Sequence, residues 1–143
     1  MARILAIDYG RKRTGIAVTD NLQIIANKLT TVRTHELIGF LTDYFTKENV
    51  VEVVVGYPLT LANQPSESIR YINPFLKQFQ KTFPDIKLVL ADERFTSKIA
   101  FQTMIDAGVK QKERRNKELI DAVSAQIILQ WHLEYKRNTN NKL

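Results

Sequence analysis

The sequence predicts an α/β protein, a mixed β-sheet flanked by helices, and two observations support this class. Three segments in the first third have strand patterns, and their connections are so short that they can only join antiparallel neighbours. The rest of the chain alternates helical periods with short apolar runs, as right-handed parallel crossovers require. With 143 residues in all, residues 1–136 are expected to form a single domain and the polar residues 137–143 a disordered tail.

The first three strands are expected to lie next to one another. Residues 3–9 (RILAIDY) form a mostly apolar run, which is typical of a central strand covered on both faces. Residues 15–19 follow after a short turn. Residues 23–32 come after Asp20 and Asn21, which are suited to a tight turn.

A helix, a strand and a second helix follow. Thr34 is a candidate cap for a helix that reaches about Glu48. Residues 50–56 (VVEVVVG) are a β-branched run that predicts a buried strand. Ser66 is a candidate cap for the second helix, in which Pro74 predicts a kink or a restart.

The last third is expected to contain one more strand and two helices. Residues 86–91 predict a buried strand, and residues 96–107 predict a helix that ends at Gly108, a good left-handed terminator. A long helix is expected over residues 117–135. Its apolar face comprises Ile120, Val123, Ile127, Ile128 and Trp131.

Composition excludes several kinds of site. The chain has no cysteine, which excludes disulfides, thiolate zinc sites, iron–sulfur clusters and a cysteine nucleophile. His35 and His132 stand almost the whole chain apart, which argues against histidine-rich metal sites and Ser-His-Asp arrangements. Without a signal peptide or a membrane-length apolar run, a soluble cytoplasmic protein is expected. Lysine and arginine outnumber aspartate and glutamate 21 to 15, and the net charge of +6 favours polyanionic partners.

Acidic residues stand where strands of the predicted sheet end and where its last helix begins. Asp8 is near the end of the first strand, and Asp92 and Glu93 directly follow the strand over residues 86–91. Ligands bind at the carboxyl ends of strands in open sheets, and burying an unpaired carboxylate is costly. Asp121, in the first turns of the last helix, borders its apolar stripe. The structural alternatives are a salt bridge for Asp8 and a polar strand exit for the Asp-Glu pair.

Carboxylates from three elements that converge at one sheet edge are what hard divalent cations require. Mg²⁺ prefers carboxylate oxygens and keeps its remaining positions for water and substrate phosphate. Two such ions about 4 Å apart promote phosphodiester hydrolysis by activating water and stabilising the departing oxygen. With no cysteine and with distant histidines, the composition favours carboxylate-bound Mg²⁺ or Mn²⁺.

Two basic segments could flank this acidic centre. The first consists of Arg11, Lys12 and Arg13, between Gly10 and Gly15, in a turn that exposes backbone N–H groups to phosphate. The second comprises the cations before and at the start of the last helix, Lys110, Lys112, Arg114, Arg115 and Lys117. An acidic metal site with a basic surround is typical of a nuclease that binds a polyanion. The alternative for the second segment is a solvated loop.

Taken together, these motifs resemble those of the YqgF (RuvX-like) family of RNase H-fold proteins, described as pre-16S rRNA nucleases and as Holliday-junction-resolvase-like. The matching stretches are ILAIDYGRKRTGIAVTD, VVVGYPLTL, LADERFTS and NKELIDAVSAQIILQ, in a match that covers nearly the full length. The resemblance implies an RNase H-like five-stranded mixed sheet in the order 3-2-1-4-5, flanked by helices. The loop from Tyr57 to Asn63 departs from the family pattern by the loss of an aspartate and of the second glycine.

The resemblance also implies the site residues. They are the acidic metal ligands Asp8, Glu93 and Asp121 and the residues that line or shape the site, Thr14, Gly15, Arg94 and Thr96. Of these, Thr14, Gly15 and Arg94 are also expected to contact nucleic acid. Glu93 is favoured over Asp92 because the fifth strand lies two spacings, roughly 10 Å, from the first, a gap that the longer side chain crosses more easily. Alternation also sends the side chains at positions 92 and 93 to opposite faces of the strand.

These expectations favour a metal-dependent endonuclease that acts on structured nucleic acid. The resemblance makes processing of the 5′ end of pre-16S rRNA the first expectation, with pre-ribosomal particles as partners, and cleavage of branched DNA the second. A non-catalytic nucleic-acid adaptor is the main alternative. An ATP-dependent phosphotransferase of the actin and hexokinase type is a weaker one, because 143 residues supply only one of the two lobes needed. Both a monomer and a homodimer stay open.

Overall fold

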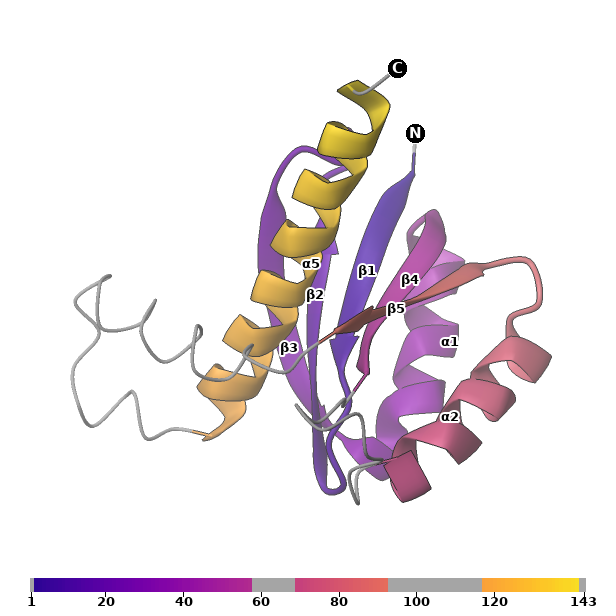
Figure 1. The fold of residues 1–143 in the computed structure, drawn as a ribbon. Helices are drawn as coiled ribbons and strands as arrows, with labels where there is room; N and C mark the ends of the chain where they lie inside the picture. Colours follow the sequence, from indigo (N-terminus) through magenta and orange to yellow (C-terminus); the bar gives the residue numbers. More distant parts are fainter. Residues whose placement is uncertain (1, 58–68, 93–116, 142–143) are drawn as a thin grey trace.

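The computed structural model describes residues 2–57, 69–92 and 117–141 (Figure 1). Its strands are β1 (Arg3–Asp8), β2 (Arg13–Thr19), β3 (Ala26–Arg33), β4 (Val50–Tyr57) and β5 (Lys87–Asp92). Its helices are the 3₁₀ turn η1 (Thr34–Glu36), α1 (Leu37–Lys47), α2 (Ile69–Thr82) and α5 (Lys117–Asn141). The predicted strands and helices that fall on described residues are therefore present.

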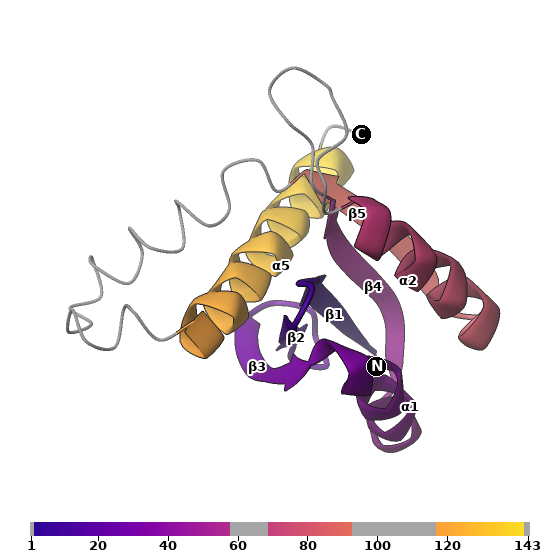
Figure 2. The ribbon, with the colours of Figure 1, turned by 90° about the horizontal axis from the view of Figure 1, so that it is seen from below.

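The five strands form one mixed sheet in the order β3-β2-β1-β4-β5, which confirms the predicted class and order. Strand β1 pairs antiparallel with β2 and parallel with β4, so the antiparallel and parallel halves of the sheet meet at β1. Helix α5 covers one face of the sheet, while α1 and α2 cover the other, as Figure 2 shows. The molecule thus has three layers with the sheet in the middle.

Strand alternation divides the core between the two faces. Along β1, Leu5 and Ile7 pack in the cluster under α1 and α2, whereas Ile4 and Ala6 pack in the cluster under α5. The sheet side of the α5 cluster carries several alanines, namely Ala6, Ala17, Ala26 and Ala91. Their small side chains leave room for α5 to lie close to the strands. By the same alternation Asp8, two residues after Ala6, lies on the α5 face.

Two local predictions about helices differ from the structure. The prediction that Thr34 caps a helix is wrong, because its hydroxyl donates instead to the carbonyl oxygen of Gly10 at 2.6 Å. Helix α1 begins after η1, and Glu36 at its N-cap makes no side-chain hydrogen bond to the helix. Of the kink or restart predicted at Pro74, the restart does not occur, because helix α2 continues through Pro74 as one element.

Helix α5 is longer than predicted. It runs to Asn141, so residues 137–141 belong to the helix and not to a separate tail. Nη2 of Arg137 donates to the carbonyl oxygen of Ile24 at 2.7 Å, which ties this end of the helix to the β2–β3 connection. The predicted helix over residues 96–107 and the Ser66 cap lie outside the described residues. Among the described helices, none combines the length and apolar character that crossing a membrane requires.

Candidate active site

Gly15 brings together the predicted acidic residues of β1 and α5. In the antiparallel pair of β1 and β2, Asp8 lies opposite Gly15. A Cβ atom added at Gly15 would overlap the carbonyl oxygen of Asp121, so the first turns of α5 pass directly over this glycine. The backbones of Asp8 and Asp121 therefore flank one glycine, at the edge of the sheet where β1 ends and α5 begins (Figure 1).

Asp121 forms an ion pair with Arg13, the first residue of β2. Nε of Arg13 lies 3.2 Å from Oδ2 of Asp121, and 36% of the arginine and 25% of the aspartate side chain are exposed. Arg13 precedes Gly15 by two residues and so shares its face of the sheet. Because solvent reaches the pair, its net stabilisation is small, about 0–1 kcal/mol. A ligand with stronger charge can therefore compete for either partner.

Thr34 and Thr14 hold the turn between β1 and β2. Thr34 donates its hydroxyl to the carbonyl oxygen of Gly10 at 2.6 Å and its backbone N–H to that of Lys12 at 3.0 Å. Its Oγ1 also lies 3.0 Å from Oγ1 of Thr14. Thr14, predicted to contact nucleic acid, is fully buried, so in this structure its hydroxyl supports the turn. Gly10 is required here, because a Cβ atom would overlap the carbonyl oxygen of Arg13.

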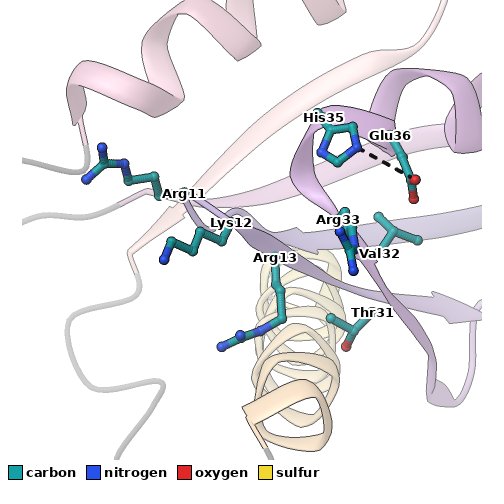
Figure 3. A pocket seen from close by; sticks show the side chains of 8 residues that line it. All are labelled: Arg11, Lys12, Arg13, Thr31, Val32, Arg33, His35 and Glu36. Carbon is teal, nitrogen blue, oxygen red and sulfur yellow. Dashed lines mark ion pairs between the residues drawn. The ribbon is translucent and has the colours of Figure 1, made fainter.

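The cations of this turn line an open pocket of about 710 Å³ (Figure 3). Its basic lining residues are Arg11, Lys12, Arg13, Arg33 and His35. Arg11 also lies over the ring of Tyr71 on α2, 5.0 Å from the ring centre. Arg33 is not among the residues predicted from the sequence. The signal that finds it is strand register, since Arg33 on β3 lies opposite Arg13 on β2.

Several predicted site residues lie outside the described part of the chain. They are Glu93, Arg94, Thr96, Lys110, Lys112, Arg114 and Arg115. Asp92 ends β5 and Lys117 begins α5, but their side chains are also outside the description. Of the atypical loop from Tyr57 to Asn63 only Tyr57 is described, and its hydroxyl donates to Oδ1 of Asn73 at 2.9 Å. The functional roles of these residues stay predictions.

Asp8 and Asp121 supply donor chemistry that suits a hard divalent cation. Both are carboxylates, from separate elements, and Gly15 between them adds no side chain. The guanidinium of Arg13 already sets a positive charge against Asp121, which shows that a cation is accepted there. Within the described residues no three histidine, cysteine or acidic side chains gather as a metal cluster, and the third predicted ligand, Glu93, lies outside them. The residues present fit Mg²⁺ or Mn²⁺ as part of a ligand set.

The strand order, the helices on both faces and the carboxylates at the end of β1 and in the first turns of α5 define an RNase H-like α/β protein. A family model described as RuvX, Holliday junction resolvase, matches residues 2–135, and the chain belongs to this family. This confirms the resemblance found in the motifs.

Close relatives cover nearly the whole chain. The chain is 59% identical to a protein of Flavobacterium johnsoniae and 57% identical to one of Phocaeicola vulgatus. It is 54% identical to a protein of Bacteroides fragilis. Each match covers 96% of this chain and 99% of the relative, and all three relatives carry the name "Putative pre-16S rRNA nuclease".

Proposed function

We propose that this protein is a metal-dependent endonuclease that processes the 5′ end of pre-16S rRNA in ribosome biogenesis. The observation that carries the proposal is that the backbones of Asp8 and Asp121 flank Gly15, at the kind of sheet edge where open α/β folds bind ligands. The name shared by the relatives supports the choice of substrate. Asp8, Glu93 and Asp121 are the proposed ligands of Mg²⁺ or Mn²⁺. Structured RNA within pre-ribosomal particles is the proposed partner.

Strand β5 supports the choice of Glu93 as the third ligand. Val89 and Ala91 belong to the apolar cluster under α5. The alternation of side chains along a strand predicts position 93 on the same face, the one that Asp8 shares, and this supports the choice of Glu93.

In the proposed mechanism the described residues have distinct tasks. Asp8 and Asp121 hold the metal, which when bound supplies Lewis acidity and a water of lowered pKa. Gly15 lets α5 approach β2 closely enough for both carboxylates to serve one site. Arg13, beside Asp121, is placed to bind phosphate oxygens of the substrate, because its planar guanidinium matches them in pairs. The exposed cations of the turn extend the contact to neighbouring phosphates.

Single Asp8→Asn and Asp121→Asn variants test the proposal on a 5′-extended 16S rRNA precursor with Mg²⁺ or Mn²⁺. We expect cleavage to fall at least about 100-fold in each, because changes to groups that only orient metal ligands already cost 10–100-fold. Asp43→Asn is the matched control. Its carboxylate is exposed on α1, where it pairs with Lys47 at 3.0 Å, and full activity is expected. Equal, metal-independent cleavage by all three variants would refute the proposal.

The family description favours a second candidate, cleavage of branched DNA. A panel of single-stranded, duplex and branched RNA and DNA with Mn²⁺ separates the two. Preference for a four-way DNA junction would reassign the substrate and predict a homodimer, since a symmetric junction suits a two-fold enzyme, whereas a monomer suffices for the RNA. Salt-dependent binding without turnover in any divalent metal would indicate an adaptor. A cytoplasmic location stays a prediction.

A further inference from the structure

A cross-strand pair of arginines stands beside the proposed active site. Arg13 of β2 lies directly opposite Arg33 of β3 in the antiparallel register. Side chains at such positions have Cβ atoms about 4.5–5.5 Å apart, and like charges there destabilise a sheet. Among the described residues Arg33 has no carboxylate partner, while Arg13 has Asp121. An anion bound between the two guanidinium groups would relieve this repulsion.

The arginine pair shares a face of the sheet with the carboxylates. Gly15 pairs with Thr31, and two residues away Arg13 pairs with Arg33, so all four positions lie on the α5 face. Two residues along a strand span about 7 Å, which separates the arginine pair from the row that contains Asp8. One strand of nucleic acid can therefore reach the carboxylates and the arginine pair at the same time.

The pair belongs to the wall of the 710 Å³ pocket, which is strongly cationic. Arg11 and Lys12 add two further charges, and Figure 3 shows the three basic side chains of the turn spreading from one loop, with Arg33 on the neighbouring strand. Of the described residues that line the pocket Glu36 alone is acidic, and its Oε1 lies 3.7 Å from Nε2 of His35. The pocket therefore suits a polyanion.

The pocket also indicates which part of a nucleic acid it binds. Guanidinium groups match pairs of phosphate oxygens in a bidentate way. No tryptophan, tyrosine or phenylalanine is among the described residues that line the pocket, so it lacks the rings on which bases stack. Contacts to backbone phosphates fix the register of the nucleic acid without reading its sequence. A phosphodiester is the occupant that this chemistry favours.

We propose that Arg13 and Arg33 form a phosphate clamp, a two-arginine site that binds a backbone phosphate near the one to be cleaved. The inference rests on the proposed nuclease function and deepens it, because it adds Arg33 as a substrate-positioning residue and predicts recognition without base readout. The turn that carries Arg13 is held in place by Thr34, which donates to Gly10 and Lys12, so one side of the clamp is pre-organised.

Anisotropy of a labelled RNA duplex in EDTA tests the clamp without cleavage. Arg33→Ala is expected to weaken binding about tenfold, as the loss of one charge-assisted contact would. The slope of log K against log salt should fall by about 1, equally for duplexes of different sequence. Lys28→Ala, which removes an exposed cation of the same strand outside the pocket, is the control and should bind as the wild type does. Arg33→Lys keeps the positive charge but loses the two-pronged guanidinium, so its affinity for RNA should lie between those of Arg33→Ala and the wild type.

Thermal unfolding separates the clamp from a structural role. Since Arg33 is exposed and faces Arg13, its removal should leave Tm unchanged or slightly higher. Binding by Arg33→Ala equal to that by Lys28→Ala would overturn the clamp, as would a loss of binding that only follows a loss of Tm. The nuclease proposal is refuted by a different result. If Arg33→Ala weakens RNA binding but the wild-type protein cleaves no nucleic acid, the clamp is supported and the nuclease function is refuted.

Discussion

Helix α5 takes part in two acid–base contacts, one in each half, that differ in burial. In its first turns Asp121 pairs with Arg13 at 3.2 Å, and 25% of the aspartate side chain is exposed. In its second half His132 and Lys136 approach Glu52 of β4, with Nε2 and Nζ at 2.9 and 3.1 Å from Oε2. Only 4% of the Glu52 side chain is exposed.

The Glu52 cluster joins α5 to the parallel half of the sheet. A third partner, Nζ of Lys87 on β5, lies 3.5 Å from Oε1 of Glu52. The hydrogen bond with His132, aided by Lys136, lowers the pKa of Glu52 from 4.5 to about 2, although burial acts in the opposite direction. A buried carboxylate with this many partners is satisfied inside the protein, which is the condition for a structural role.

At the two ends of α5, burial and position, more than the chemical type of the pair, distinguish the enclosed acid Glu52 from Asp121, the acid proposed to bind metal. Asp121 keeps a solvent-accessible pair at the edge where β1 ends, which is where open sheets bind ligands. Glu52 lies near the start of its strand and is enclosed. One end of α5 is therefore expected to govern activity and the other to govern stability.

The largest difference is expected between Asp121→Asn and Glu52→Gln. Asp121→Asn should lower cleavage at least about 100-fold and change the free energy of unfolding by less than about 1 kcal/mol, because its ion pair is exposed. Glu52→Gln should lower the free energy of unfolding by about 1.5–3 kcal/mol, because it removes the charged acceptor that buried His132 and part-exposed Lys136 contact, and should keep kcat where the protein is folded. Urea unfolding and cleavage rates measure both. Lost cleavage activity in folded Glu52→Gln would contradict a purely structural role for Glu52.

The dependence of stability on pH tests whether Glu52 is paired in the folded protein. Because its pKa is lower in the folded state, its contribution to stability is fully present above 4.5, the unfolded-state value, and is lost as the pH falls toward about 2. The shift corresponds to about 3 kcal/mol. Urea unfolding across this range should show a steeper fall for the wild type than for Glu52→Gln. Parallel curves would contradict a paired Glu52 in the native state.

Gly15→Ala tests the close approach of α5 at the acidic end. The added Cβ would overlap backbone atoms of Asp121 and Ala122, which can yield only if the start of α5 shifts. We expect a loss of about 1–3 kcal/mol in stability and up to about 100-fold in cleavage, since small displacements of a site are costly. Gly39→Ala, on α1 with nothing within 4 Å of the new Cβ, is the control and should be neutral or stabilising. Full activity and stability in Gly15→Ala would show that α5 does not cross this glycine.

Arg13→Ala should have the smallest effect on stability. Its ion pair with Asp121 is open to solvent, so we expect the free energy of unfolding to change by less than about 1 kcal/mol in urea. Binding of RNA should weaken all the same, because Arg13 is half of the proposed phosphate clamp. A loss of stability as large as that expected for Glu52→Gln would show that the Arg13–Asp121 pair also has a structural role. The expected difference between the two ends of α5 would then be refuted.

Much of the fold and part of the site could be predicted from the sequence because they depend on local patterns. Apart from the C-terminal end of α5, which runs on to Asn141, apolar periods located the described strands and helices to within a few residues. The short connections of the first third dictated antiparallel neighbours. Asp8 at the end of β1 and Asp121 beside the apolar stripe of α5 followed from the same patterns. Periodicity was less reliable for single side chains. Trp131, predicted in the apolar face, is 48% exposed, whereas its neighbour His132 is buried.

The tertiary structure decided the pairings between distant residues. Thr34 uses its hydroxyl on Gly10 rather than on its own helix, and Arg33 meets Arg13 only through the register of β2 and β3. Buried His132 finds its partner in Glu52, 80 residues away in the sequence, with Nε2 2.9 Å from Oε2. The physical reason is that a local pattern specifies the face and period of an element, whereas a partner is selected by register, helix rotation and packing. These are properties of the whole folded chain.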